Sequence, residues 1–160
     1  MPKPPKTHPH APRISNKRAR FEFELLERFE AGIALKGTEV KSIRLGNASL
    51  NEAYARIEQD QAYLVNFQVL PYEQGNIHNH DPKRPKLLLL HRRQIKKLAS
   101  KVQVRGLTLI PVCVYFNSKG LAKVEIALAR GRTYHDRRDS QRKREDQREM
   151  DRARRGRNDR

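Results

Sequence analysis

A long run of alternating side chains, from Phe21 to Leu35, constrains the fold of this 160-residue chain more than any other feature. The odd positions are mostly apolar and the even positions mostly charged, with Leu26 as an exception. This period of two predicts a strand with one buried face. Because the run exceeds the usual strand length, the strand has to bend, and Gly32 is the expected place. A long, bent first strand is typical of a small β-barrel, in which one strand serves both halves of the sheet.

A basic connection follows this strand. The period of two ends at Gly37, and Thr38 can cap a short helix that Gly46 can close. Glycine also allows another backbone to approach closely. The connection carries three cations within about two helical turns: Lys36, Lys41 and Arg44. This arrangement predicts a surface that faces phosphate groups.

The rest of the apolar pattern predicts an ordered series of elements. It indicates a hairpin over 53–69, a loop over 71–86, a short strand or lead into a helix at 87–90, an amphipathic helix over 91–105, and strands over 107–116 and 124–128. Pro111 argues for an edge or a bulge. Three strands, a helix and two strands match an oligonucleotide-binding (OB) barrel, which binds nucleic acid partly through its 1–2 connection. We therefore predict an all-β fold with peripheral helices, an OB-fold-like closed β-barrel followed by a basic C-terminal tail.

The charge distribution divides the chain into three parts. The formal net charge is +17, which points to a polyanion, either nucleic acid or an acidic membrane surface. Residues 1–13 are basic and rich in proline and are expected to be disordered, residues 14–130 form the barrel, and residues 131–160 are a basic tail. The tail lacks an apolar face, so it should be mostly unfolded when free and fold against a polyanion. No apolar run could span a bilayer, and no helix has the large apolar face of a membrane-surface helix, so nucleic acid is favoured.

Two acidic residues within the basic neighbourhood, Glu30 and Glu39, allow two interpretations. Each could form a surface ion pair, which usually contributes little. Alternatively, each carboxylate could accept hydrogen bonds from base amino groups, which would give a selectivity that lysines cannot provide.

No group of residues makes a positive argument for catalysis or for a cofactor. His78, His80 and Asp81 lie close together, with His91 further along, but their spacing matches no tetrahedral metal site and lacks cysteine partners. We expect no metal and interpret them as polar residues near RNA. A nucleophile elbow and a P-loop are also absent from the sequence. The one cysteine, Cys113, is expected to be a buried thiol, and a chain without an internal disulfide suits a reduced, intracellular setting.

Five sequence blocks occur in order along the chain: Asn16-Lys17-Arg18-Ala19, Glu30-Ala31-Gly32-Ile33, Gly37-Thr38-Glu39-Val40-Lys41-Ser42, Leu88-Leu89-Leu90-His91 and Gly131-Arg132-Thr133-Tyr134-His135-Asp136-Arg137-Arg138. Together they closely resemble the small protein B (SmpB) family, the SsrA-binding proteins that partner bacterial transfer-messenger RNA (tmRNA). The resemblance runs from about Ile14 to Arg144.

The resemblance implies an OB-like barrel that grips the tRNA-like domain of tmRNA at its elbow. The RNA-contacting positions that the resemblance implies are Asn16, Glu30, Leu89 and His91, with basic support from the 36–44 connection. The full set of residues that we predict to bind RNA is Asn16, Lys17, Arg18, Glu30, Lys36, Gly37, Thr38, Glu39, Lys41, Ser42, Arg44, Leu89 and His91. The resemblance also implies that the tail becomes helical in the ribosomal decoding centre and the empty messenger channel. The implied tail contacts are Gly131, His135, Asp136, Arg137, Arg138, Arg142 and Arg144.

Two parts of the chain depart from the family pattern. Leu87 stands where a basic residue is expected before the three leucines, which puts a phosphate contact at that position in question. Beyond about Glu145 the tail is rich in arginine without matching a motif.

The sequence therefore predicts a cytoplasmic, monomeric adaptor without enzymatic activity. It would bind the tRNA-like domain of tmRNA and deliver it to stalled ribosomes for trans-translation, with neither DNA nor a membrane as partner. The alternative is an OB-type ribosomal or initiation-factor-like protein that binds ribosomal RNA directly. An enzymatic rival is a metal-dependent nuclease that uses the histidines at 78–80.

Overall fold

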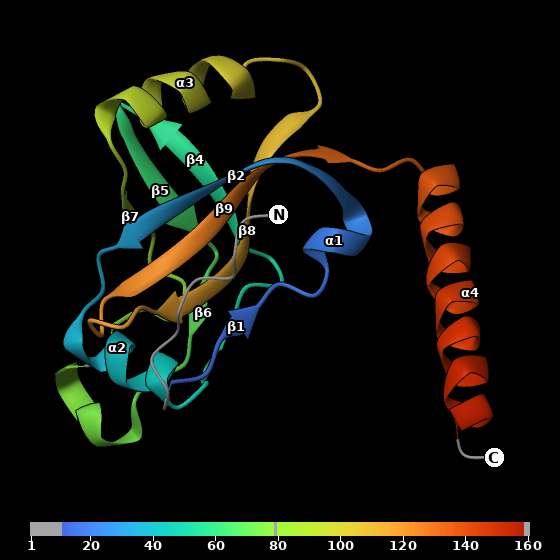
Figure 1. Ribbon diagram of the computed structural model, residues 1–160. Coiled ribbons are helices and arrows are strands. Elements are labelled where there is room, and N and C mark those ends of the chain that lie inside the picture. The colour runs from blue at the N-terminus through green and yellow to red at the C-terminus, as the bar shows by residue number, and fades with distance from the viewer. Residues whose placement is uncertain (1–10, 79, 159–160) are drawn as a thin grey trace.

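The computed structural model describes residues 11–78 and 80–158 (Figure 1). Its strands are β1 (Ile14–Ser15), β2 (Phe23–Ile33), β3 (Ala48–Ser49), β4 (Tyr54–Glu58), β5 (Gln61–Val65), β6 (Gln68–Val69), β7 (Lys86–Leu89), β8 (Leu107–Phe116) and β9 (Ala122–Gly131). Its helices are α1 (Ala19–Glu22), α2 (Gly37–Arg44), α3 (Arg92–Val102) and α4 (Tyr134–Asn158), with a 3-10 helix, η1, at Glu73–His78. The fold is thus mostly β-sheet with several helices.

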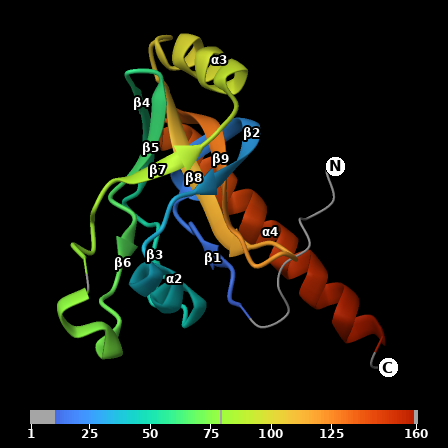
Figure 2. The same ribbon diagram turned by 90° about the vertical axis from the view of Figure 1, so that its left-hand side faces the viewer.

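Seven strands form one antiparallel sheet in the order β1-β8-β4-β5-β7-β2-β9, and β8 also pairs with β9. The short strands β3 and β6 pair with each other. The core lies inside the curved sheet, where Leu64, Val114 and Ile126 are fully buried. Figures 1 and 2 show α3 across one end of the sheet, α2 near the other end, and α4 to the side. The outer face of the sheet carries exposed side chains, among them Glu30 and Leu89.

The predicted long strand is confirmed as β2, although Phe21 belongs to α1 and Leu35 follows the strand. The irregularity in its pairing lies between Leu25 and Glu27, while Gly32, where we expected a bend, pairs with both β7 and β9. Leu26 is the extra residue of this bulge and is 44% exposed, which explains why it departs from the apolar alternation.

Most of the remaining elements lie where the pattern predicted them. The hairpin is β4–β5, whose two turn residues Gln59 and Asp60 have positive φ angles, as its tight turn requires. The predicted amphipathic helix is α3, and the register of β8 shifts between Pro111 and Cys113. The bulge that Pro111 indicated is thus confirmed.

The short helix of the basic connection is confirmed as α2, but the prediction for its first turn is wrong. Lys36, not Thr38, occupies the N-cap position, because the helix already begins at Gly37. Gly46 follows the helix with a φ angle of 81°, which favours glycine, so the predicted end is confirmed.

The two ends of the chain can be compared with the predicted segments 1–13 and 131–160. Residues 1–10 of the segment 1–13 lie outside the described residues, whereas Ala11 packs against the core. The tail is helix α4 in this structure, and its order in the free protein stays a prediction. Among the described residues, no helix combines the length and the apolar character needed to cross a bilayer.

Candidate nucleic-acid interface

Four neighbouring strands place one residue each in a row across the outer face of the sheet. Tyr115 of β8 pairs with Lys123 of β9, Lys123 with Gly32 of β2, and Gly32 with Leu89 of β7. Paired residues on antiparallel strands share a face, so the absent side chain of Gly32 leaves room between Lys123 and Leu89. A Cβ atom at Gly32 would lie 3.1 Å from the Cβ of Leu89, which is tighter than ordinary packing.

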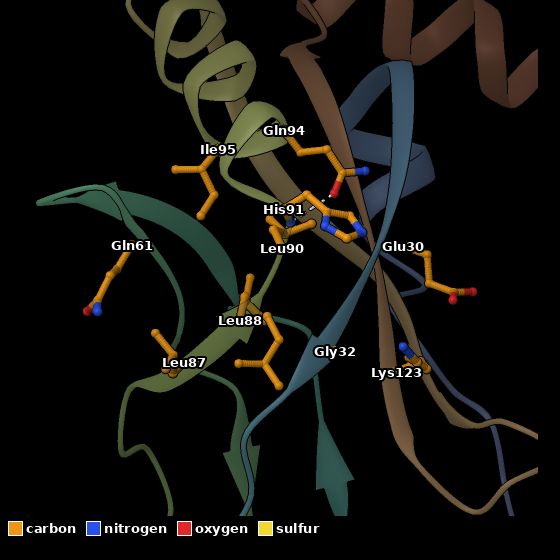
Figure 3. A pocket seen from close by; sticks show the side chains of 11 residues that line it. Glu30, Gly32, Gln61, Leu87, Leu88, Leu90, His91, Gln94, Ile95 and Lys123 are labelled. Carbon is orange, nitrogen blue, oxygen red and sulfur yellow. Dashed lines mark hydrogen bonds between the residues drawn. The ribbon is translucent and has the colours of Figure 1, made fainter.

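A groove of about 580 Å³ opens at this row (Figure 3). It brings together Glu30, Leu89 and His91, three predicted RNA-binding residues that come from two distant sequence blocks. Leu89 is 57% exposed, so its side chain is available for an apolar contact with a partner. We call this surface the Leu89 groove; its other lining residues are Gly32, Gln61, Leu87, Leu88, Leu90, Gln94, Ile95 and Lys123.

His91 is placed at the groove by the start of α3. It occupies the N-cap position of this helix, and its backbone N–H donates to Oε1 of Gln94 at 3.2 Å (Figure 3). This contact satisfies a donor that the first helical turn would otherwise leave open. The imidazole is therefore carried on a fixed helix end beside the leucines of β7.

Glu30 differs electrostatically from the neighbouring carboxylate on the same face. Glu125, which pairs with Glu30 across the strands, forms ion pairs with Arg28 at 2.8 Å and Arg13 at 3.7 Å. Within the described part of the chain, Glu30 has no ion pair and accepts its one hydrogen bond from the Tyr115 hydroxyl. Glu30 thus forms no ion pair in that part of the chain, and the second interpretation, in which its carboxylate accepts from base amino groups, stays a prediction.

The three cations of the basic connection are exposed, as predicted. The Nζ atom of Lys41 lies 5.3 Å from the ring centroid of Tyr72, and Cζ of Arg44 lies 5.2 Å from that of Phe116. A second groove of about 510 Å³ opens beside the start of α2. We call it the α2 groove; it is lined by Lys36, Gly37, Thr38, Lys41, Tyr72, Gln74, Gly75 and His80.

Lys17 and Arg18 are also exposed, just before α1. The Arg18 guanidinium forms an ion pair with Glu22 at 2.8 Å, one helical turn further on. An exposed pair of this kind is easily exchanged for a phosphate contact.

Three of the predicted RNA-binding residues lie in the interior, which the sequence did not indicate. Glu39 forms an ion pair with Arg84, as the first interpretation held, but at 5% exposure the carboxylate is buried and not on the surface. The Ser42 hydroxyl donates to the carbonyl of Leu70 at 2.6 Å. Their polar groups are occupied within the protein, so these two residues hold α2 against the loop before β7.

Asn16 is the third interior residue, at 5% exposure. Its side-chain amide donates to the carbonyl of Pro111 at 3.0 Å and accepts from the backbone N–H of Ala19 at 3.1 Å. Asn16 therefore fixes the start of α1 to β8, and in this way places the exposed side chains of Lys17 and Arg18.

A lysine does precede the leucines, but one position earlier than expected and buried. Lys86 donates from Nζ to the carbonyls of Phe67 at 3.0 Å and Arg84 at 2.9 Å. Burial lowers the pKa of Lys86, although nearby Glu39 acts in the opposite direction. Leu87 itself lines the Leu89 groove and offers an apolar contact in place of a charge.

The beginning of the tail is tied to the end of α1. The backbone N–H of Arg132 donates to the carbonyl of Glu22 at 2.9 Å. Thr133 and Asp136 cap α4 reciprocally, since the N–H of Thr133 donates to Asp136 Oδ2 at 3.1 Å and the N–H of Asp136 donates to Thr133 Oγ1 at 3.4 Å. Asp136, a predicted ribosome contact, therefore also starts the helix.

Of the other predicted tail residues, Gly131 ends β9 and the rest follow along the start of α4. The exposed ones are Gly131, Arg137, Arg138, Arg142 and Arg144, while the side chain of His135 lies outside the described part. The arginines follow the cap within about three helical turns.

Two further expectations concern the burial of Cys113 and the histidines near residue 80. Cys113 is buried, as predicted, and burial raises the pKa of its thiol. In the part of the chain that the structure describes, no three His, Cys, Asp or Glu residues are grouped as a metal site would need. The side chain of His78 lies outside that part.

Sequence reasoning missed several groove residues. Gln61, Gln94 and Lys123 line the Leu89 groove, and Tyr115 supports it through Glu30. The only available signal was the alternation of Lys123 with Val124 and Glu125, which placed it on an exposed face. The 107–116 segment is apolar on both faces, so nothing in its pattern distinguished Tyr115.

The chain is similar to several known proteins. The model of the family described as SmpB protein matches residues 13–156. An SsrA-binding protein of Rhizorhabdus wittichii is 53% identical over 137 residues, which cover 86% of this chain and 86% of that protein. An SsrA-binding protein of Caulobacter vibrioides is 50% identical over 145 residues, covering 91% of this chain and 95% of that protein.

A solved structure is also similar. It is described as "tmRNA-SmpB: a journey to the center of the bacterial ribosome", with a TM-score of 0.67 and 49% identity, covering 78% of this chain and 87% of the other. Because the family model spans most of the chain and the relatives are identical at half or more of the aligned positions, the chain belongs to the SmpB family of SsrA-binding proteins.

Proposed function

We propose that this chain binds the tRNA-like domain of tmRNA and delivers it to stalled ribosomes for trans-translation. The observation that carries the proposal is the Leu89 groove, which gathers Glu30, Leu89 and His91 on one exposed surface. Family membership and the similarity to a tmRNA-SmpB structure support it. The function is that of a cytoplasmic adaptor, which acts by binding and has no catalytic step.

We further propose that the sheet is an OB-like closed barrel. The support is the series of pairings β8-β4-β5-β7-β2-β9, which returns to β8 because β9 also pairs with β8. An OB barrel binds nucleic acid on its sheet and through its 1–2 connection. In this chain that connection is the basic segment 36–46.

The two grooves suit different parts of a folded RNA. The Leu89 groove offers an apolar platform, an imidazole and a carboxylate, which suit an unstacked base with amino groups. The α2 groove offers Lys36 and Lys41 beside an aromatic ring, which suit the phosphate backbone. One surface would give selectivity and the other affinity.

The tail supplies the second part of the function. Its exposed arginines, carried on α4, would contact ribosomal RNA in the decoding centre and the empty messenger channel. In that position the tail would stand in for the anticodon arm and the codon that tmRNA lacks. The tail would fold or keep its helix there because phosphates neutralise its positive charge.

The test is to purify the tagged protein from lysate at moderate salt and to sequence the bound RNA. We expect tmRNA to be enriched far above its share of cellular RNA, and a Leu89→Ala variant to lose this enrichment. An exposed Leu121→Ala variant serves as the matched control. Ribosomal RNA enriched in proportion to its abundance, in place of tmRNA, would support direct ribosomal RNA binding and contradict the proposal.

A further inference from the structure

We propose that Tyr115 is a positioning residue for RNA recognition. Its hydroxyl holds one oxygen of the Glu30 carboxylate at the edge of the Leu89 groove, and the other oxygen accepts a hydrogen bond from an amino or hydroxyl group of the RNA. The inference rests on the proposed function, because it assumes that the groove binds RNA.

Tyr115 reaches Glu30 across an intervening strand. Glu30 on β2 pairs with Glu125 on β9, and Glu125 pairs with Cys113 on β8, two residues before Tyr115. The phenol therefore crosses β9 diagonally to donate to Oε2 of Glu30. This contact joins two strands that do not pair with each other directly at this point.

The surroundings of Tyr115 restrict where its hydroxyl can point. The residue is 1% exposed, and Cζ of Arg13 lies 5.9 Å from its ring centroid. Burial, and then Glu30 itself, raise the pKa of Tyr115, so the phenol stays protonated and acts as a donor at neutral pH. A buried, protonated tyrosine is a rigid support for an exposed carboxylate.

A charged donor and a neutral donor would affect the Glu30 carboxylate differently. An arginine partner, such as Arg28 or Arg13 at Glu125, would neutralise the carboxylate and would compete with RNA for it. A neutral hydroxyl fixes the side chain and leaves its negative charge in place. An unsupported glutamate would lose rotamer freedom when RNA binds, and this contact removes part of that loss beforehand.

The experiment is a double-mutant cycle on the full chain, with a transcript of the tRNA-like domain of tmRNA as the probe. We expect Tyr115→Phe to raise Kd about three- to tenfold, as for the loss of one hydrogen bond, and Glu30→Gln to raise it further. The double variant should bind no worse than Glu30→Gln, because Tyr115 acts through Glu30. The salt dependence of Kd should be unchanged in Tyr115→Phe, since this change leaves the cations that face the phosphates in place.

Two further variants distinguish the loss of the Tyr115–Glu30 contact from a loss of protein stability. Glu30→Asp changes only an exposed side chain, retains the charge and withdraws it from the hydroxyl, so it should weaken binding about as much as Tyr115→Phe. Tyr54→Phe, on an exposed site of β4, is the matched control and should leave Kd unchanged.

The possible results separate the inference from the proposed function. Wild-type affinity in Tyr115→Phe, or losses that add in the double variant, would overturn the positioning role. A lower unfolding temperature with additive losses would likewise indicate a structural role alone. Failure of the wild-type protein to prefer this RNA would instead overturn the proposed function.

Discussion

Arg84 and Glu39 form a bidentate ion pair between the loop before β7 and helix α2. Nη2 of Arg84 lies 2.8 Å from Oε1 and 3.1 Å from Oε2 of Glu39, and its Nε lies 2.9 Å from Oε1. The Glu39 side chain is 6% exposed and that of Arg84 is 29% exposed. Glu39→Gln leaves the arginine without its counter-charge, so we expect urea unfolding to show a loss of about 2–4 kcal/mol in the free energy of unfolding.

The same loop offers a matched control. Lys83 and Glu52 form an exposed pair 3.6 Å apart, so Lys83→Met should cost less than about 1 kcal/mol. Equal effects of the two changes would show that the burial of Glu39 does not strengthen its pair.

The three cations of the basic connection should contribute to RNA affinity without contributing to the core. Changing Lys36, Lys41 and Arg44 together to Ala removes three exposed cations. Filter binding should show weaker binding, and the slope of log K against log salt should become shallower by about 0.7–0.9 for each phosphate that the variant no longer neutralises. The unfolding temperature should change little, since none of the three side chains is buried.

A second triple variant matches this change in charge. Arg56, Lys83 and Arg105 are exposed on other parts of the molecule. Their change to Ala should reduce affinity less. An equal reduction would mean that net charge alone, and not the α2 groove, accounts for the weaker binding.

Binding of tmRNA and function on the ribosome should separate in a truncated protein. Removing residues 131–160 leaves both grooves in place, so affinity for the tRNA-like domain should be retained. Peptide tagging on stalled ribosomes should be abolished, because the arginines of α4 are gone. A translation assay with a transcript that lacks a stop codon measures tagging, and normal tagging would contradict the two-part model.

The cap of α4 predicts different outcomes for two changes at one residue. Asp136→Ala removes the acceptor for the N–H of Thr133 and should destabilise the helix by about 1 kcal/mol, seen as weaker circular dichroism at 222 nm. Asp136→Asn keeps an acceptor oxygen there and should retain most of the helical signal. If Asp136→Asn also loses tagging, the charge of Asp136 acts on the ribosome in addition to the cap.

The buried Lys86 predicts a dependence of stability on pH. Its pKa in the folded protein lies below the ordinary value of 10.5, so the unfolded chain binds more protons in the alkaline range below that value. Stability from this residue therefore rises as pH increases towards 10.5, and the unfavourable burial of its charge is fully present at lower pH. Urea titrations at pH 7 and pH 10 should show the difference between wild type and Lys86→Met changing in favour of wild type.

Much of the fold could be predicted from side-chain periodicity because the longest elements have one buried face. β2, the β4–β5 hairpin and α3 all show this pattern clearly. The two-residue strands β1, β3 and β6 are too short to show a period, and partners distant in sequence set their conformation. The bulge at Leu26 disturbed the alternation visibly, yet its cause became apparent only from the register with β9.

The candidate site was less predictable because its members come together through register. Leu89 and His91 follow from family resemblance, but the neighbours Gly32, Lys123 and Tyr115 lie on three strands. Residue type also failed to separate exposed from buried polar groups. Glu39 looks like a surface residue until Arg84, 45 positions later, is brought against it.

Because α4 is anchored at its start and is long, a small rotation at the anchor produces a large displacement at its far end. The bond from Arg132 to Glu22 and the Thr133–Asp136 cap set the direction in which the helix leaves the sheet. Its 25 residues extend about 37 Å at 1.5 Å per residue. A tilt of about 10° at the anchor would thus move the far tip by about 6 Å, so small adjustments of the body on its RNA are amplified at the distal arginines.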